Sequence, residues 1–459
     1  MSRIMTARLY GYQVIGGNMG VSDIGSSAME PKLRRYPAFV RFWLASTVSD
    51  FGTYITTLAL SVLILVTMNG TPLDQGLVNA ARWTPYLLFG LVAGVWIDRF
   101  PRRTVLIGGD LGRGLILAAV CVPAVAGALS VPTLLILMFV FGTLALTSDA
   151  AYQSFIPQLV PRPLLTKANA RLQQSDTVAQ TTGSAVAGGL VAVVSAPVAL
   201  LLDAVSYFFS AAVLVTLERP SGRVPVRSKQ RLHRKVAEGL RWVYGHSHLA
   251  PLAWSTHIWF IGSAILGAVL PTVILNDLRL GALGLGLVMG CSGIGAVAGT
   301  TLSTRLGHRW GTGNAMVAAR LAQPFAIALV ALAPLAAGGE RTGEIYGSPL
   351  HWPGELWAAF ALAGFGQLLF GMAMGVEGPL EMGYQQAVTP DRLIARMSAT
   401  RRSVNRGMIV IGAPLGGVIA TVAGTDTALW AAAAFLLLAS LVLLFSRFRD
   451  ARIEEALIP

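Results

Sequence analysis

The chain has 459 residues, of which 54% are hydrophobic and only 12% are charged. Too few polar side chains are present to cover a water-soluble surface of this size, so the composition indicates an integral membrane protein. The formal net charge of +13 would suit a nucleic-acid partner. We predict none, because the basic residues gather on one side of the predicted membrane.

Apolar runs of about 20 residues, the length that crosses a bilayer, recur along the chain. Runs this long that do not alternate with polar residues exclude a membrane barrel, because backbone groups in lipid must pair within the segment. We therefore predict an all-α membrane protein with twelve transmembrane helices. The predicted spans are 39–67, 75–97, 104–126, 131–150, 171–194, 197–217, 251–275, 281–303, 313–336, 356–378, 404–424 and 427–446.

The positions of Lys and Arg predict the orientation. With both termini in the cytoplasm, the basic residues in outer segments are Arg279 and Arg341, whereas the dense basic stretch 219–241 lies on the inner side. This is the positive-inside pattern, and the basic stretch can also contact anionic lipid. Arg far outnumbers Lys, as in GC-rich bacterial genomes, so we predict a protein of the bacterial plasma (inner) membrane.

These spans divide the chain into five predicted segments. We expect a flexible cytoplasmic N-terminal segment, a six-helix half, a basic cytoplasmic linker, a second six-helix half and a cytoplasmic tail. Their bounds are 1–36, 37–217, 218–250, 251–446 and 447–459.

Polar side chains recur every three or four residues along the first span, which places them on one helix face. They are Trp43, Thr47, Asp50, Tyr54, Thr57 and Ser61. A carboxylate facing lipid would cost about 3 kcal/mol, so this face should look into the bundle or a water-filled cavity.

The second span repeats this pattern with Asn79, Arg82, Trp83 and Tyr86. Arg82 is a candidate counter-ion for Asp50, although the depths of the two residues differ by roughly a third of the bilayer. The structural alternative is a permanent ion pair that locks the first two helices together.

A charged link of six residues, Asp98–Arg103, joins the second and third spans. One acid and three arginines between two membrane segments must lie at a membrane face. We interpret this link as part of a cytoplasmic gate. The alternative is that the arginines only mark the inner face.

Charged and titratable side chains also lie within later spans. Asp110 and Arg113 form an i, i+3 pair that can neutralise itself, whereas Arg320 has no acid nearby in the sequence and needs a partner elsewhere. His257, three residues after Trp254, either titrates or is a hydrogen-bonded structural group.

The tenth span contributes Glu377 and Glu381, broadly on one face with Gln367 and Met374; Glu381 either shares this face or lies in the following loop. A proton-coupled carrier needs an acid that gains and loses a proton as its surroundings change. The coupling candidates are Asp50, Arg82, Glu377 and His257. The predicted cavity-lining residues are Thr47, Tyr54, Thr57, Asn79, Trp83, Tyr86, Trp254, Gln367 and Met374.

The sequence gives no sign of a metal site, a cofactor or enzyme chemistry. Cys121 and Cys291 both fall inside spans and suit packing positions. Neither a nucleotide-binding loop nor a nucleophile elbow is present. We therefore predict that the chain is not an enzyme and binds no cofactor.

An internal repeat relates the two predicted halves. Residues 152–190 align with 381–419 at a constant offset of 229, which places Pro161 on Pro390 and Gly183 on Gly412. A second copy of the charged link, 304–309, has a threonine where the first has Asp98. Two repeated six-helix halves with substrate bound between them are a known transporter plan.

The link and several further stretches resemble the major facilitator superfamily, in the branch that contains macrolide-efflux proteins and the enterobactin exporter. The link residues that match the family motif are Gly94, Asp98, Arg99, Arg102, Arg103 and Leu106. The further stretches are FIPQLVPRPLLTKANA at 155–170, LLLDAVSYFFSA at 200–211 and RRSVNRGMIVIGAPLGG at 401–417.

The resemblance implies a monomeric secondary transporter that moves a small molecule by alternating access. We expect a proton-coupled exporter of amphipathic compounds, drug-like or siderophore-like. The family's antiporter signature is incomplete, since Ser184 follows Gly183. A transporter of a narrower metabolite without proton antiport therefore stays open, as does a sensor or assembly protein with this fold.

The family architecture also implies contacts for the cytoplasmic gate. Asp98 is expected to cap the eleventh helix near Asn405, and Arg102 or Arg103 to reach Asp149. The repeat suggests two latches of opposite charge. One joins Asp98 to the end of the eleventh helix that carries Arg402 and Arg406, and the other joins Asp176 to Arg305.

Overall fold

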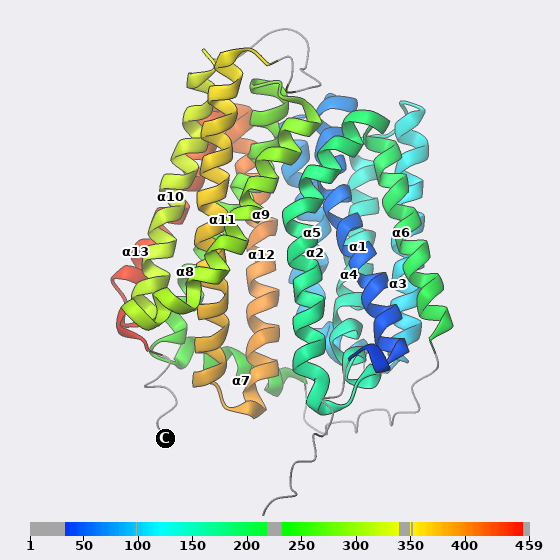
Figure 1. Ribbon diagram of the computed structural model, residues 1–459, viewed down its shortest axis with the longest axis vertical. Coiled ribbons are helices and arrows are strands. Elements are labelled where there is room, and N and C mark those ends of the chain that lie inside the picture. Colours follow the sequence, from blue (N-terminus) through cyan, green and yellow to red (C-terminus); the bar gives the residue numbers. More distant parts are fainter. Residues whose placement is uncertain (1–32, 98, 218–231, 339–348, 350–351, 453–459) are drawn as a thin grey trace, which may run out of the picture.

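The computed structural model describes residues 33–97, 99–217, 232–338, 349 and 352–452. Long helices run side by side through a single bundle (Figure 1). They are α1 (Pro37–Val62), α2 (Pro72–Ile97), α3 (Arg102–Val125), α4 (Val131–Leu159), α5 (Leu165–Val194), α6 (Ala196–Thr216), α7 (Leu232–Gly245), α8 (Leu249–Thr272), α9 (Gly281–Trp310), α10 (Thr312–Ala336), α11 (Gly354–Val388), α12 (Asp391–Ala423) and α13 (Thr425–Leu444).

Eleven helices among the described residues are long and apolar enough to cross a membrane. This confirms the prediction of an all-α membrane protein. The predicted span 75–97 is not among the eleven. It corresponds to α2, a helix of 26 residues that packs against α4 and α12, so the count of twelve spans stays a prediction.

The helix contacts repeat between the two halves. In the first half α1 packs on α5 and α6, α3 on α4 and α6, and α2 on α4. In the second half α8 packs on α12 and α13, α10 on α11 and α13, and α9 on α11. Each half also opens on a helix that continues into a π-helical turn, Leu63–Thr67 or Val273–Asp277.

The two halves meet mainly through two helix pairs, α2 with α12 and α5 with α9. At the predicted outer end these backbones are in close contact. A Cβ on Gly76 would lie 2.3 Å from the carbonyl oxygen of Ala413, and a Cβ on Gly188 would lie 2.6 Å from that of Ala282. Only glycine fits such an approach, so the halves are pressed together at this end.

Several helices are longer than the apolar runs predicted, among them α5, α11 and α12. α5 begins at Leu165, α11 continues to Val388, and α12 begins at Asp391. Hydropathy detects the part of a helix that crosses lipid, whereas these helices continue as polar surface beyond it. Glu381 therefore lies in a helix and not in a loop.

Because α12 begins at Asp391, Asn405 lies well inside it. The predicted capping of a helix N-terminus near Asn405 is therefore wrong. Asp98, the residue expected to make that cap, lies outside the described residues.

The described part of the predicted basic linker includes the helix α7, which lies at the lower end of the bundle in Figure 1. This helix packs against α12 and α8. Trp242 Nε1 donates to Thr389 Oγ1 at 3.2 Å, and Glu238 forms an ion pair with Arg396. The linker therefore docks on the second half.

Candidate functional site

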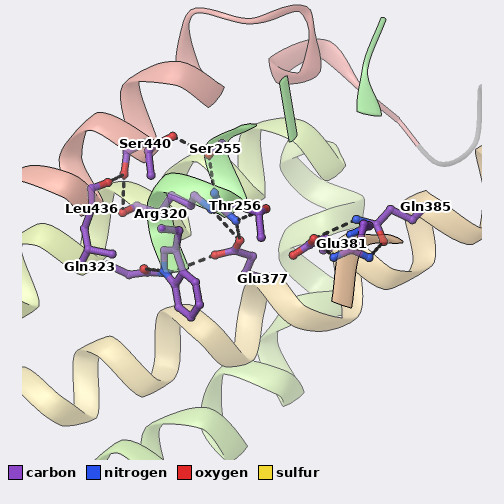
Figure 2. A network of polar contacts seen from close by, with 12 residues as sticks. Ser255, Thr256, Arg320, Gln323, Glu377, Glu381, Gln385, Leu436 and Ser440 are labelled. Carbon is purple, nitrogen blue, oxygen red and sulfur yellow. Dashed lines mark hydrogen bonds and ion pairs between the residues drawn. The ribbon is translucent and has the colours of Figure 1, made fainter. Parts of the chain in front are cut away.

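A buried ion pair joins α10 and α11 in the second half (Figure 2). Arg320 Nε donates to Glu377 Oε1 at 2.7 Å, and Arg320 Nη2 bonds the same oxygen. The side chains of Arg320 and Glu377 are 1% and 8% exposed. Since an unpaired charge at this depth would be strongly unfavourable, each side chain requires the other. Arg320 has no acid near it in the sequence, and Glu377 of another helix is its partner.

Hydroxyl and amide groups complete the hydrogen bonding of this pair. Arg320 Nη2 also donates to Thr256 Oγ1 at 3.0 Å, and Arg320 Nη1 donates to Ser255 Oγ. Gln323 Nε2 donates to Glu377 Oε2 at 3.2 Å. Residues from α8, α10 and α11 therefore form one connected network.

A second ion pair lies one helical turn further along α11. Glu381 pairs with Arg401 of α12, and Gln385 Nε2 donates to Glu381 Oε1 at 2.9 Å. The side chains of Arg401 and Glu381 are 22% and 13% exposed. This pair is more exposed than the first, and it links α11 to α12.

Both ion pairs border a cavity of about 250 Å³. Its lining combines charged or polar groups with apolar ones, namely Thr256, Trp259, Phe260, Arg320, Met374, Glu377, Gly378, Glu381, Arg401 and Asn405. The rings of Trp259 and Phe370 stack with 8° between their planes, which supports one apolar wall. Such a cavity can hold a molecule that has both an apolar body and polar groups.

His257 lies beside this cavity in a complete set of hydrogen bonds. Its Nδ1 lies 2.8 Å from Asn405 Oδ1, and its Nε2 lies 2.7 Å from the Tyr244 hydroxyl. With Nδ1–H donating to the amide oxygen, Nε2 is free to accept from tyrosine, which suits a neutral ring. This favours the structural interpretation of His257 and connects α7 to the edge of the cavity.

Asp50 of α1 lies near Asp176 and Tyr54, with Tyr54 hydrogen-bonded to Asp176. Two carboxylates therefore face the same region of the first half, on α1 and α5. Arg82 is elsewhere. Its Nη1 lies 3.4 Å from Thr57 Oγ1, and its guanidinium lies over the rings of Trp83 and Phe141.

The predicted ion pair between Asp50 and Arg82 does not form. Arg82 does meet the polar face of α1, but at Thr57 and not at Asp50, so the difference in depth between the two residues keeps them apart. The interpretation of this pair as a permanent lock on the first two helices is therefore also wrong.

The remaining cavity candidates have varied positions. Met374 lines the cavity, and Gln367 is buried with no partner for its Nε2 among the described residues. Trp254 is 57% exposed and packs against Tyr244. Asn79 is half-buried on α2. Thr47 bonds the carbonyl of the residue four before it.

The arginines of the charged link contact backbone carbonyls. Arg102 donates to Ile97 and Phe100 at 2.7 and 2.9 Å, and Arg103 donates to Leu214 at 2.8 Å. Neither reaches Asp149, so that predicted contact is wrong. The last carbonyls of a helix have no partner within the helix and attract guanidinium groups. Sequence spacing does not reveal these acceptors, so it suggested an acid as the partner instead.

The other gate residues are only partly brought together. Gly94 lies near the end of α2 and Arg99 is exposed just beyond it. Asp176 accepts from Gln173 at 3.3 Å, while Arg305 is exposed on α9. The predicted Asp176–Arg305 latch therefore does not form in this conformation.

Asp149 instead contacts the second half. Its Oδ2 accepts from the Tyr86 hydroxyl at 2.7 Å and lies 3.6 Å from Arg406 Nη1. One turn away, the Gln153 amide oxygen, turned toward α12, accepts from Arg402 at 2.7 Å. Both arginines of the predicted gate on α12 thus reach α4, across the boundary between the halves.

Sequence reasoning missed several cavity residues, including Arg401, Asn405, Thr256 and Phe260. The one usable signal was the lone intramembrane charge of Arg320, which required an acid on another helix. No cluster of metal-ligating side chains is found among the residues that the structure describes.

Two repeated halves of membrane-crossing helices, with a cavity of mixed polar and apolar lining, are the architecture of a membrane transporter. Residues 26–339 match the family model described as transmembrane secretion effector. The chain therefore belongs to this family of the major facilitator superfamily.

Individual relatives agree with this assignment. An uncharacterised transporter of the same superfamily from Sinorhizobium fredii is 24% identical over 85% of this chain and 90% of its own length. Macrolide efflux protein A of Streptococcus pyogenes is 26% identical over 34% of this chain and 38% of its own length. The chain thus aligns with well under half of that efflux protein.

A bacterial homologue of the iron transporter ferroportin, solved in an inward-facing state, has the same fold. It superposes with a TM-score of 0.70 and 15% identity, covering 92% of this chain and all of the other. At this identity the likeness establishes the fold alone.

Proposed function

We propose that the chain is a proton-coupled exporter of amphipathic small molecules, drug-like or siderophore-like, that works by alternating access. The observation that carries the proposal is the cavity that Trp259, Phe260 and Met374 line together with two ion pairs. A substrate with an apolar body and polar ends fits this lining. The family description and the macrolide efflux relative support export.

Alternating access draws support from the way the halves meet. Glycines press them together at the predicted outer end, around Gly76 and Gly188. At the predicted inner end, Arg305 on α9 and Gln173 on α5 are exposed. Close contact between the halves at one end, with exposed side chains on α5 and α9 at the other, is compatible with one state of such a cycle.

Proton coupling is assigned to Asp50, with Glu377 second. Asp50 has no ion-pair partner among the described residues and lies near a second acid, Asp176, so a proton taken up by Asp50 would relieve repulsion between two carboxylates. Glu377 is compensated by Arg320, and a proton on it would release that arginine. We place the protein in the bacterial inner membrane as a monomer with both termini in the cytoplasm.

The second candidate is a transporter of a narrower metabolite without proton antiport. One observation favours it, because both cavity carboxylates already have an arginine partner, Arg320 for Glu377 and Arg401 for Glu381. A permanently paired acid binds substrate but has less reason to exchange protons.

Reconstituted vesicles with an imposed pH gradient separate the two candidates. We expect uptake of an amphipathic dye or a macrolide to depend on the gradient and to be accompanied by proton flux. Asp50→Asn should abolish the dependence. Asp74→Asn is the matched control, since Asp74 bonds only its own turn, through Thr71, at a helix start. Movement that ignores the gradient, or an Asp50→Asn protein that behaves like the parent, contradicts proton coupling.

A further inference from the structure

An arginine from one half of the protein occupies an aromatic and acidic cage in the other half. Arg406 of α12 lies with its guanidinium carbon 4.5 Å from the ring centroid of Trp83 and 4.4 Å from that of Tyr86. The two rings are inclined by 54° with centroids 5.1 Å apart, so they form two adjoining walls. Both rings belong to α2.

Asp149 of α4 supplies the acidic side of this cage. Its Oδ2 lies 3.6 Å from Arg406 Nη1 and accepts from the Tyr86 hydroxyl at 2.7 Å. The tyrosine bond holds both the carboxylate and one aromatic wall in place. Two aromatic faces and one fixed carboxylate are the groups by which proteins recognise an organic cation.

Arg406 is held only weakly in the cage. The contact of 3.6 Å to Asp149 is longer than a charge-assisted hydrogen bond, and the side chains of Arg406 and Asp149 are 27% and 42% exposed. Solvent therefore reaches both groups, and a competing cation can reach them too. Arg406 behaves as a tethered ligand that can be displaced.

We propose that Trp83, Tyr86 and Asp149 form a binding site for the cationic group of an organic amine or quaternary ammonium substrate, with Arg406 as its built-in competitor. The proposal rests on the proposed transport function and names a substrate class for it. Because the cage lies on the first half and Arg406 on the second, a bound cation removes one contact between the halves.

The position of the cage relates it to the cavity. Asn405, the residue before Arg406, lines the cavity of the second half and bonds His257. The same stretch of α12 thus presents one side chain to that cavity and the next to the cage. A molecule with a cationic end and an apolar body could occupy both places.

Binding of a dansyl-tagged trimethylammonium probe tests the proposal. Its neutral tert-butyl isostere has the same shape without the charge. Binding is measured by fluorescence anisotropy to the full chain in nanodiscs, with empty nanodiscs subtracted. Arg406→Gln should tighten binding of the cation about ten-fold, as expected when a tethered cation–π competitor is removed, and should tighten binding of the uncharged isostere much less.

Arg402→Gln is the matched control, since it removes the same charge one turn away on α12 from a residue that contacts Gln153 and not the cage. It should change binding of the cation less than two-fold, and Arg406→Lys should leave it near the parent value. Equal gains from Arg406→Gln and Arg402→Gln would show a general charge effect and overturn the proposal.

Two further variants keep the test decisive where Arg406→Gln does not fold. Trp83→Leu and Asp149→Asn should each weaken binding of the cation by at least five-fold and binding of the isostere much less, and unchanged binding of the cation in both would refute the cage. A protein that transports with a pH gradient but fails these binding tests leaves export standing. One that passes them but shows no proton flux leaves the cage and contradicts proton coupling.

Discussion

Replacing Glu377 by glutamine should destabilise the second half more than any equivalent change at the other two glutamate pairs. Glutamine keeps the size of the side chain and removes its charge, so Arg320 is left as a buried cation. Arg320 is 1% exposed. Removing one member of a buried ion pair typically costs about 3–5 kcal/mol, because the other charge stays uncompensated.

The remaining hydrogen bonds lower this cost without removing it. Arg320 keeps its bonds to Ser255 and Thr256, but hydroxyl groups carry no charge to offset a guanidinium. For a unit of about 200 residues, 1 kcal/mol shifts the melting temperature by roughly 2–4 °C. A loss of about 3–5 kcal/mol thus corresponds to roughly 6–20 °C.

Two other pairs provide a graded control series. Glu381→Gln breaks a pair whose side chains are 13% and 22% exposed, so its effect should be smaller. Glu238→Gln breaks the pair to Arg396, whose side chains are 43% and 25% exposed, and should cost about 0–1 kcal/mol as a surface pair does.

Thermal unfolding in nanodiscs, followed by intrinsic fluorescence, measures all three variants. The expected order of loss is Glu377, then Glu381, then Glu238. Arg320→Met combined with Glu377→Leu should recover much of the stability, because apolar residues can replace a buried pair. The reasoning is refuted if the Glu377→Gln protein has the melting temperature of the parent. It is also refuted if the double variant melts no higher than Glu377→Gln.

Three further outcomes can be measured. Leucine at Gly286 should raise hydrogen exchange of α9 amides but not of α13 amides, since even its Cβ would lie 2.5 Å from a carbonyl oxygen of α5; unchanged exchange would contradict the close contact of the halves. Tyr244→Phe should cost about 1 kcal/mol in thermal unfolding, because the His257 ring loses its donor; no loss would mean that this bond adds nothing.

Burial and the neighbouring His248 lower the pKa of His246. As pH falls, His246 therefore takes up a proton more readily when α7 is undocked, and the docking of α7 weakens. Hydrogen exchange of the α7 amides should rise in acid, and His246→Asn should remove that pH dependence.

The fold was predictable because few backbone structures can cross a lipid bilayer. Each apolar run of about 20 residues must become a helix, and the repeat at an offset of 229 predicted two halves whose helices pack alike. What failed was the extent of helices beyond the lipid, as for α12, which begins at Asp391. Outside the hydrocarbon region, polar sequence no longer distinguishes helix from loop.

The pairing of charges was less predictable, since it depends on helix rotation. Asp110 and Arg113 are three residues apart and pair at 2.5 Å as expected. Arg82 and Asp50 lie on different helices, and Arg82 contacts Thr57 of α1 and the ring of Phe141 of α4 instead of Asp50. A sequence pattern gives the face that a residue occupies but not which neighbouring helix that face meets.

The charges of the two halves are arranged unequally on equivalent helices. On α3, Arg113 is neutralised by Asp110 of the same helix, so the pair survives any movement of α3 as a rigid body. On α10, Arg320 is neutralised by Glu377 of α11, so a shift between these helices separates charge.

A group that couples proton binding to helix movement must change its partner when the helices move. The ion pair within α3 keeps its partner in such a movement, although Asp110 also accepts from Ser210 of α6, whereas the pair between α10 and α11 does not. We therefore expect protonation of Glu377 to loosen the contact between α10 and α11 directly beside the cavity. Asp50 lies on the first half, so its protonation can affect helix movement only through its neighbour Asp176 on α5.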